Sequence, residues 1–375
     1  MPTSKRVAVV GVGTMGSQAM WRLAARGADV TGYERFAPGH DRSAAGGETR
    51  IFRSAQFEDT RYVPLIKHAD RLWDELQHES GRELRRLTGC LLMGPAEHQQ
   101  MRTALASIAE HGLDHEVLDA AHLAARFPQY RIEPGDVAVL DRRAGFIRPE
   151  LTVFTAARRA EQLGARIHRY TTVREVVPVA GGVRVRTDEG VEDFDAAVVS
   201  VGPWVNELLP DLKWEVDIRR LINAWYLADG DWSGEQPAFI RTAPTHCYGL
   251  PSPDGISVKI GLSRALHRPV EDPNSLDRTV RPAELEVFRE LIGRYLPGLA
   301  PDPVKLSVFM EGYTESSRPL VGPLPDNDAV VLMAGFSGHG FKLSPAYGDI
   351  AAELALDGRS ELPIEFLSTV GRTEG

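Results

Sequence analysis

Glycines and an acidic residue near the start of the chain have the spacing of a dinucleotide-binding site. The run Gly11-Val12-Gly13-Thr14-Met15-Gly16 follows an apolar segment and opens a helical one, and Glu34 ends the next apolar run. Gly11 permits a tight turn, Gly13 lets the backbone approach a pyrophosphate, and Gly16 lets a helix pack closely on a strand. Free N–H groups at the helix N-terminus attract phosphate, and Glu34 can accept hydrogen bonds from a ribose. The motif predicts a dinucleotide but leaves its identity open.

A second glycine-rich loop lies near the C-terminus. Three glycines, a histidine and a lysine fall within Gly335-Phe336-Ser337-Gly338-His339-Gly340-Phe341-Lys342. Ser344 and Pro345 have the residue types of an N-cap and a first helical residue, for a helix that runs to about Ala355. The positive end of this helix could stabilise negative charge on a reduced flavin. An ordinary strand-to-helix turn is the alternative, but it requires none of these side chains.

Two arginines, Arg50 and Arg53, follow the first motif within a glycine-containing loop. The planar guanidinium group binds a carboxylate through two parallel hydrogen bonds. A spacing of three residues could turn one of them toward a cofactor. Exposed surface arginines are the alternative, and the spacing alone does not separate the two.

Lys259 lies in an alternating run that predicts a strand. Ser257, Lys259 and Gly261 share one face of this strand, opposite Val258 and Ile260. A solvent-exposed polar face is the simpler interpretation, and strand alternation alone favours it. A lysine beside a flavin would instead supply a fixed positive charge that stabilises superoxide.

The elements that must position these residues alternate between strands and helices. A strand at 7–10, a helix at 18–25 and a strand at 30–33 form a βαβ unit, and an antiparallel meander at 173–187 is typical of flavin-binding domains. We therefore expect an α/β (α+β) fold with a Rossmann-like dinucleotide-binding domain and an inserted substrate domain on a mixed or antiparallel sheet. The predicted dinucleotide-binding domain, which the resemblance described below implies to be an FAD-binding domain, covers 1–85, 145–212 and 318–375, and the predicted substrate domain covers 86–144 and 213–317.

Composition and charge exclude several other functions. The 375 residues carry a net charge of −9, so the chain lacks the basic footprint of a nucleic-acid-binding protein. No apolar run reaches the length of a membrane span, and the first strand begins too early to leave room for a signal peptide. Cys90 and Cys247 form neither a disulfide framework nor a metal site. We expect a cytoplasmic protein with no metal, nucleic-acid partner or membrane partner.

Six segments together resemble the monomeric sarcosine oxidase and N-methyltryptophan oxidase family, which belongs to the FAD-dependent D-amino-acid-oxidase-like amine oxidases. They are G-V-G-T-M-G, E-T-R-I-F-R, Y-V-P-L, V-K-I-G, E-G-Y-T and G-F-S-G-H-G-F-K, and they span nearly the whole chain. The resemblance implies that the cofactor is FAD and that the reaction oxidises the C–N bond of an amino acid, usually a secondary amine. It also implies that O2 reoxidises the flavin to give hydrogen peroxide while the imine hydrolyses.

The resemblance also assigns roles to residues. Arg53 and Lys342 match the pair that binds the substrate carboxylate, and Arg50 matches an arginine close to the flavin. Lys259 matches the lysine that activates oxygen, and Tyr313 matches a tyrosine of the substrate pocket. The residues predicted to bind the cofactor are Gly11, Gly13, Thr14, Met15, Gly16, Glu34, Arg35, Ser43, Thr49, Arg50, Val173, Gly202, Trp204, Gly335, Gly338, His339, Gly340 and Lys342.

The chain departs from the family pattern at several positions. Glu311 stands where members with covalent flavin carry a cysteine, so the flavin is predicted to be non-covalent, and Glu311 could contact a substrate amine. Gly46 and Ser263 replace two family histidines, so the substrate need not be sarcosine. Arg318 resembles an arginine of D-amino-acid and glycine oxidases and is a rival carboxylate binder.

The sequence thus predicts an FAD-dependent amine oxidase whose partners are an amino acid with a free carboxylate and O2. The protein is expected to be a monomer or a simple homodimer. Alternatives that stay open are a flavin dehydrogenase with another electron acceptor, a D-amino-acid or glycine oxidase specificity, a nicotinamide-dependent dehydrogenase and a non-enzymatic FAD-binding protein.

Overall fold

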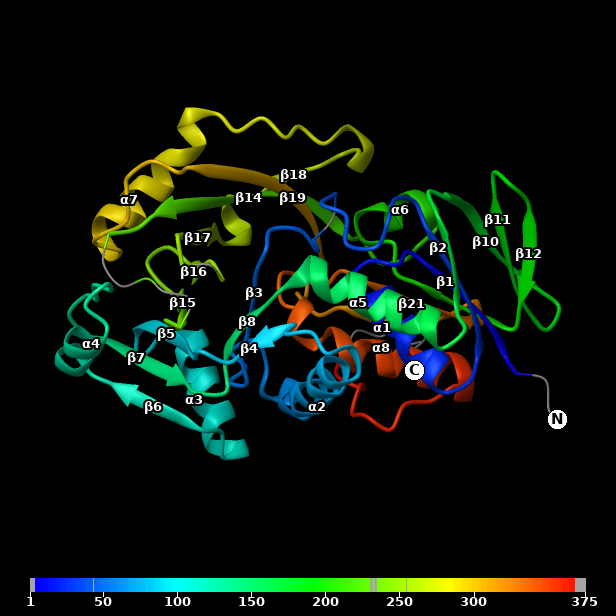
Figure 1. Ribbon diagram of the computed structural model, residues 1–375, viewed down its shortest axis with the longest axis horizontal. Coiled ribbons are helices and arrows are strands. Elements are labelled where there is room, and N and C mark those ends of the chain that lie inside the picture. Colours follow the sequence, from blue (N-terminus) through cyan, green and yellow to red (C-terminus); the bar gives the residue numbers. More distant parts are fainter. Residues whose placement is uncertain (1–3, 43, 230–231, 233–234, 254, 368–375) are drawn as a thin grey trace.

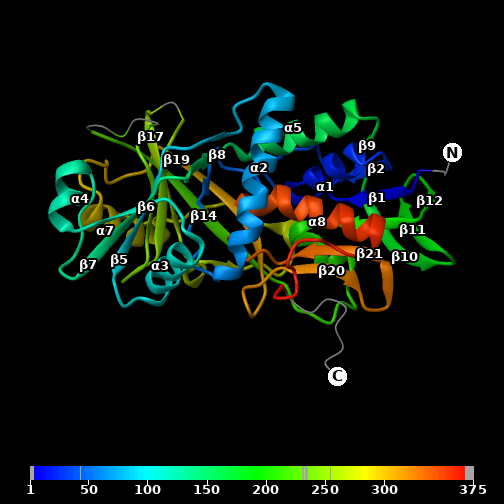
Figure 2. The same cartoon turned by 90° about the horizontal axis from the view of Figure 1, so that it is seen from below.

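The computed structural model describes residues 4–42, 44–229, 232, 235–253 and 255–367. Within these residues the chain forms two large sheets, which lie at the right and the left of Figure 1 and again in the view from below in Figure 2. The first sheet has the strand order β20 (Leu320–Leu324), β21 (Asn327–Ala334), β13 (Ala196–Val199), β1 (Arg6–Val10), β2 (Asp29–Glu34) and β9 (Arg166–Arg169). The pairs β21–β13–β1–β2–β9 are parallel, and β20 is antiparallel to β21.

Both faces of this first sheet are covered, as continuous apolar strands require. On one face Val7 and Val9 join a core with helix α1 (Thr14–Ala25), which packs against α5 (Pro149–Gln162) and α8 (Ser344–Asp357). α2 (Val63–Ser80) packs against α8 in turn. On the other face Ala8 and Val10 join a second core with the meander of β10 (Val173–Val179), β11 (Gly182–Thr187) and β12 (Val191–Phe194).

The second sheet is mixed, as predicted, and it carries the other part of the chain. Its strand order is β18 (Arg268–Pro269), β14 (Asp217–Leu227), β17 (Ser257–Leu262), β16 (Cys247–Pro251), β15 (Ala238–Arg241), β5 (Cys90–Pro95), β7 (Asp136–Asp141) and β6 (His115–Leu118), and β19 (Lys305–Tyr313) also pairs with β14. β15 and β5 are parallel, whereas the other pairs are antiparallel. The helices of this part are α3 (Gln99–His111), α4 (Ala120–Arg126) and α7 (Glu286–Tyr295).

Short elements connect the two sheets. A small sheet has the order β3 (Arg50–Phe52), β8 (Gly145–Ile147) and β4 (Arg85–Arg86). The remaining turns of helix are α6 (Val205–Leu208), η1 (Thr60–Tyr62), η2 (Gly202–Trp204), η3 (Arg264–Leu266), η4 (Pro273–Ser275), η5 (Pro282–Leu285) and η6 (Phe341–Leu343).

The predicted cap of the last helix is wrong. Ser344 is not an N-cap: η6 runs directly into α8, so Leu343 occupies the N-cap position and Ser344 is already helical.

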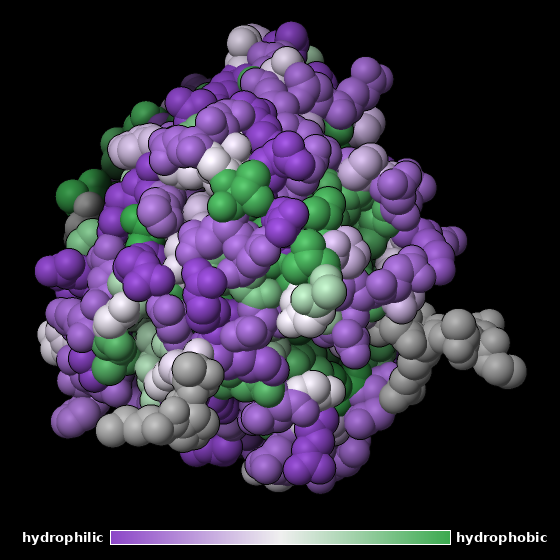
Figure 3. All heavy atoms as spheres, turned by 90° about the vertical axis from the view of Figure 1, so that its right-hand side faces the viewer, coloured by the Kyte–Doolittle hydropathy of each residue, from purple (hydrophilic) through white to green (hydrophobic). Residues whose placement is uncertain are grey.

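The face shown in Figure 3 is mainly hydrophilic, and its hydrophobic side chains gather only in small groups. Among the residues that the structure describes, no helix is long and apolar enough to cross a membrane.

Gly46 and Phe309 fit each other closely between the two parts of the chain. A Cβ atom at Gly46 would lie 2.2 Å from Cε1 of Phe309 on β19. Phe309 is buried, with 3% of its surface exposed. Any side chain at position 46, including a histidine, therefore collides with this ring unless the ring moves.

We predict that Gly46→Ala lowers the free energy of unfolding by about 1–3 kcal/mol, as overpacking of a core does. Thermal unfolding of the purified protein measures the effect. Adding Phe309→Leu should restore part of the loss, because the smaller side chain frees the space. Gly293→Ala in α7 is the control, since its Cβ would meet nothing within 4 Å. Strictly additive losses in the double variant would contradict the proposed fit.

Candidate active site

A cavity of about 950 Å³ collects residues from both parts of the chain. Its volume is near the upper end of the range of about 300–1,000 Å³ found for ligand pockets. The loop between β1 and α1, the loop between β21 and α8, and residues of β14 and β19 all contribute to its lining. The first glycine motif and the second glycine-rich loop therefore line the same cavity.

The first glycine motif has the backbone that its spacing predicts. Gly11 has a φ of +85°, and a Cβ there would lie 2.7 Å from the carbonyl oxygen of Ser200. A Cβ at Gly16 would lie 1.8 Å from the carbonyl oxygen of Gly11. Helix α1 therefore lies too close to the turn for any side chain at position 16. A Cβ at Gly13 would meet nothing within 4 Å, and Gly13 lines the cavity as the N-cap of α1. The motif therefore offers an open backbone and a helix N-terminus to a ligand.

Glu34 is held rigidly beside this motif. Its Oε2 accepts a hydrogen bond from the Val12 N–H at 2.8 Å, and its Oε1 accepts one from the Phe36 N–H at 2.9 Å. Nε2 of His40 lies 3.6 Å from Oε1, and burial lowers the pKa of His40. The carboxylate is 4% exposed and lines the cavity, so it can accept further hydrogen bonds from a ligand there.

The loop of residues 44–50, which we call the arginine loop, is held by hydrogen bonds from Arg50 to the loop's own backbone. The Arg50 guanidinium donates to the carbonyl oxygens of Ala44 at 2.5 Å, Gly46 at 2.6 Å and Thr49 at 2.7 Å. Arg50 also lines the cavity. It therefore presents a fixed positive charge, which suits the electron-rich part of a flavin.

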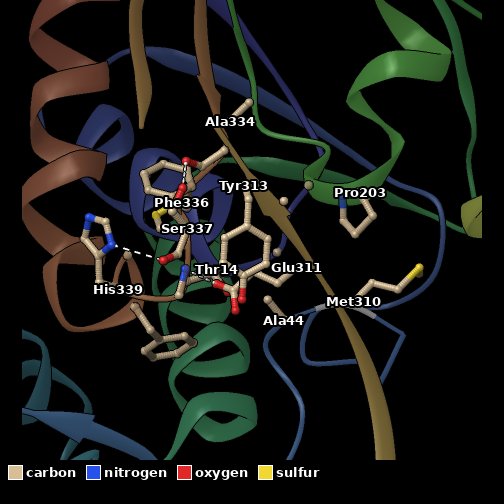
Figure 4. A pocket seen from close by; sticks show the side chains of 18 of the residues that line it. Thr14, Ala44, Pro203, Met310, Glu311, Tyr313, Ala334, Phe336, Ser337 and His339 are labelled. Atoms are coloured by element: carbon tan, nitrogen blue, oxygen red, sulfur yellow. Dashed lines mark hydrogen bonds between the residues drawn. The ribbon is translucent and has the colours of Figure 1, made fainter. Parts of the chain in front are cut away.

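Glu311 joins β19 to the second glycine loop. Its Oε1 accepts a hydrogen bond from the Gly338 N–H at 2.8 Å. Burial raises the pKa of Glu311, although the nearby Arg50 opposes this shift. Figure 4 shows Glu311 and Tyr313 on the same side of β19, beside Ser337 and His339 of the loop. Both side chains line the cavity.

Tyr313 is fixed by a histidine that the sequence did not indicate. The Nε2 of His267 lies 3.1 Å from the carbonyl oxygen of Leu262, which can only accept, so Nε2 carries the proton. Burial lowers the pKa of His267 to about 4, so the neutral ring accepts at Nδ1, 3.0 Å from the Tyr313 hydroxyl. His267 lines the cavity together with Ser263, where the family histidine is missing.

Two buried cations and a carboxylate form an ionic cluster, which we define as Arg53, Lys342 and Glu58. Arg53 donates to Oε1 of Glu58, and Nζ of Lys342 lies 3.6 Å from the same oxygen. Lys342 also donates to the carbonyl oxygen of His339 at 2.9 Å. Burial opposes ionisation of Glu58, but the two cations overcome it and lower its pKa. All three residues line the cavity, so the cluster can bind an anionic ligand beside Glu58.

The predicted oxygen-activating lysine is deeply buried, so the simpler interpretation of a solvent-exposed strand face is wrong. Lys259 has 0% of its surface exposed and donates to the carbonyl oxygens of Gly47 and Thr49. Burial, reinforced by the positive charge of Arg50, lowers the pKa of Lys259 well below its usual value. Lys259 thus contacts Gly47 and Thr49, and none of these three residues lines the cavity.

Most of the predicted site residues meet at this cavity. Among the described residues that were predicted, Lys259, Thr49 and Gly16 are not part of the lining, and Ser43 lies outside the described residues. The predicted residues that do line it are Gly11, Gly13, Thr14, Met15, Glu34, Arg35, Arg50, Arg53, Val173, Gly202, Trp204, Glu311, Tyr313, Gly335, Gly338, His339, Gly340 and Lys342.

Sequence reasoning missed Glu58, His267 and the pair His246 and Gln100, all of which line the cavity. Glu58 follows Arg53 in the same loop. An acidic residue so close to a predicted carboxylate binder could have indicated an ion pair with it. His267 follows Ser263 closely, so a shifted histidine could also have been considered. No local pattern links His246 to Gln100, because different elements bring them together.

The family model described as FAD-dependent oxidoreductase matches residues 6–354. The chain belongs to the FAD-dependent oxidoreductase family. It is 34% identical to the monomeric sarcosine oxidase of Streptomyces avermitilis over 365 residues, covering 96% of this chain and 95% of that protein. It is 30% identical to an N-methyl-L-tryptophan oxidase of Escherichia coli over 370 residues, covering 95% and 96%. The resemblance seen in the sequence motifs is confirmed.

Solved structures show the same fold. NikD, an unusual amino acid oxidase essential for nikkomycin biosynthesis, aligns with a TM-score of 0.83 at 24% identity over 96% of each chain. Glycine oxidase from Geobacillus kaustophilus aligns with a TM-score of 0.82 at 20% identity, covering 99% of this chain and all of that one. At these identities the likeness concerns the fold alone, and it confirms the predicted mixed α/β architecture.

FAD, and not NAD, is therefore the dinucleotide of the glycine motif. The open backbone at Gly13, the N-terminus of α1 and the fixed carboxylate of Glu34 fit its ADP half. The Arg35 guanidinium lies 5.6 Å from the Trp204 ring, and both line the same cavity. Cys90 and Cys247 are buried and outside the cavity lining, so neither cysteine is placed to attach the flavin covalently.

The ionic cluster predicts that anion binding depends on pH. Burial lowers the pKa of Lys342 to about 7, and the two neighbouring cations lower the pKa of Glu58. Lys342 is therefore cationic below pH 7 and loses its charge as the pH rises above it. We expect the Kd of propionate, measured by calorimetry on the holoenzyme, to rise at least about tenfold from pH 6 to pH 8.5, because a charge-assisted hydrogen bond is lost.

Lys342→Met is the matched variant for this measurement. It should bind propionate weakly at both pH values, with a flat profile. An equal rise in Kd in the wild type and the variant would assign the pH dependence to another group.

Proposed function

We propose that this enzyme oxidises the C–N bond of an amino acid with a free carboxylate, best as a secondary amine, and passes the electrons to O2. The amine loses two electrons and two protons to become an imine, which water hydrolyses to a carbonyl compound and an amine. O2 takes up the two electrons and two protons as H2O2. Bound FAD supplies the two-electron acceptor between these halves.

The observation that carries this proposal is the ionic cluster on the same cavity as the glycine motif. Arg53 and Lys342 are 6% and 4% exposed, so a carboxylate bound to them would be largely removed from water. Arg318 is a weaker candidate, because its side chain is 44% exposed and its guanidinium lies 3.8 Å from Asp59. A buried pair of cations supports an amino acid as the substrate. The sarcosine oxidase and N-methyltryptophan oxidase relatives support a secondary amine.

Other residues of the cavity would orient the reacting amine. The hydrogen bond from Tyr313 to His267 fixes the tyrosine ring, and the buried Glu311 offers a carboxyl group beside it. We propose that Tyr313 shapes the substrate pocket and that Glu311 contacts the amine. Burial raises the pKa of Glu311, which makes this carboxyl a better proton acceptor and suits contact with an amine that must lose its proton before oxidation.

Release of peroxide and flavin tests the proposal directly. The purified protein should be yellow, acid should release its flavin into solution, and a panel of N-methyl, cyclic secondary and D-amino acids should include substrates that yield H2O2 under air. Flavin that stays with the denatured chain would contradict the non-covalent cofactor. Substrate-dependent bleaching without peroxide would instead favour the alternative, a flavin dehydrogenase with another electron acceptor. Turnover of only D-amino acids or glycine would favour that specificity.

Lys259 is proposed to promote the reaction of the reduced flavin with O2 as a buried ammonium group, whose protonated form is favoured by the carbonyl oxygens of Gly47 and Thr49 against the burial that lowers its pKa. Lys259→Met should slow flavin reoxidation much more than flavin reduction, both measured by stopped-flow absorbance. Lys305→Met is the matched control, because Lys305 pairs with Glu48 and holds the same loop from its exposed side. Similar slowing in both variants would mean that Lys259 acts only by positioning the loop.

A further inference from the structure

A hydrogen-bonded pair of polar side chains lines the cavity away from the nucleotide motif. Gln100 lies in the first turn of α3, and His246 directly precedes β16. Nδ1 of His246 lies 3.1 Å from Oε1 of Gln100. We call these two residues the polar pair. Both belong to the part of the chain built on the second sheet, and neither takes part in the steps described above.

The polar pair lies next to the ionic cluster. The guanidinium of Arg53 stacks on the ring of Phe57 at 3.7 Å, and the Phe57 ring centroid is 6.1 Å from that of His246. The charges of Glu58 and Arg53 both act on the imidazole of His246. A ligand whose carboxylate binds the cluster can therefore extend its other end toward the polar pair.

The polar pair leaves one donor and one acceptor for a ligand. The amide oxygen of Gln100 can only accept, so Nδ1 of His246 carries the proton. Burial lowers the pKa of His246 to about 4, so the ring is neutral near pH 7 and its Nε2 is an acceptor. Within the described part of the chain, no hydrogen bond is formed by this Nε2 or by the NH2 group of Gln100. Nδ1 of the neighbouring cavity residue His98 is also buried without a partner.

A carboxamide matches this arrangement. Its carbonyl oxygen can accept from the NH2 group of Gln100 while its own NH2 group donates to Nε2 of His246. An aliphatic group of the same shape would leave both atoms unpaired, which costs binding free energy. A carboxylate would direct its lone pairs at the lone pair of Nε2 and would lie near the anionic Glu58.

We infer that His246 and Gln100 determine substrate specificity and select an amino acid with a neutral hydrogen-bonding side chain, best a carboxamide. This inference rests on the proposed function, because it takes the ionic cluster as the site of the α-carboxylate. Ligands that lack an amine can bind but cannot be oxidised. Their binding therefore tests this inference separately from the proposed oxidase function.

The test measures Kd by calorimetry on the holoenzyme for succinamate, its near-isostere 4-methylpentanoate, and succinate. The next longer set, glutaramate, 5-methylhexanoate and glutarate, places the same end groups one methylene further from the carboxylate. We expect the amide to bind at least about tenfold more tightly than the aliphatic acid in one set, because two hydrogen bonds are gained. Equal or tighter binding of both aliphatic acids, or of both dicarboxylates, would overturn the inference.

Variants of the polar pair complete the test. His246→Phe and Gln100→Met should each reduce the preference for the amide to less than about threefold, as the loss of one hydrogen bond requires. His122→Phe on the exposed surface of α4 is the control and should keep the full preference, since the His122 side chain is 75% exposed. Binding of propionate reports whether the ionic cluster is intact in each variant. An unchanged preference in both variants with propionate still bound would overturn the inference.

Oxidation of matched substrates distinguishes failure of the inference from failure of the proposed function. If N-methylasparagine and N-methylleucine both yield peroxide at equal kcat/KM, the specificity assignment is wrong and the oxidase function stands. If no amino acid yields peroxide while succinamate binds in preference, the proposed function is wrong and the polar pair remains a carboxamide site.

Discussion

The ammonium group of Lys259 holds together the two parts of the molecule that share the cavity. It lies on the second sheet, yet its hydrogen bonds go to the carbonyl oxygens of Gly47 and Thr49, in the loop that leads from the nucleotide motif to Arg50. A buried cation without these acceptors would be costly. The loop therefore has to remain in place, and with it the carbonyl oxygens that fix the guanidinium of Arg50.

The histidines of the cavity contribute little charge near pH 7. Burial lowers the pKa of His246, His267 and His339 to about 4, so these rings are neutral near pH 7. The buried cations of the lining that pair with a carboxylate beside the second glycine-rich loop are Arg53 and Lys342, and Glu58 is their shared counter-charge. A ligand carboxylate must therefore share its cations with Glu58, which ties ligand affinity to the protonation of Lys342.

The sequence predicted the features of the site that depend on residues close together in the chain. The spacing of Gly11, Gly13 and Gly16 fixes a turn and a helix start, and strand alternation put Lys259 opposite the apolar face. The burial of Lys259 could not be predicted from alternation, because a distant loop covers it. The pairing of His267 with Tyr313 likewise depends on a contact between separate elements. The domain boundaries stay a prediction.

The fit between Gly46 and Phe309 constrains how such a site can change over generations. A side chain at position 46 and a large ring at position 309 exclude each other, because they occupy the same space. Replacing Gly46 first creates a clash, and shrinking Phe309 first leaves a void beside the arginine loop. The two positions are thus epistatic: a chain with this glycine and this ring can acquire a side chain at position 46 only through a less stable intermediate or by a simultaneous double change.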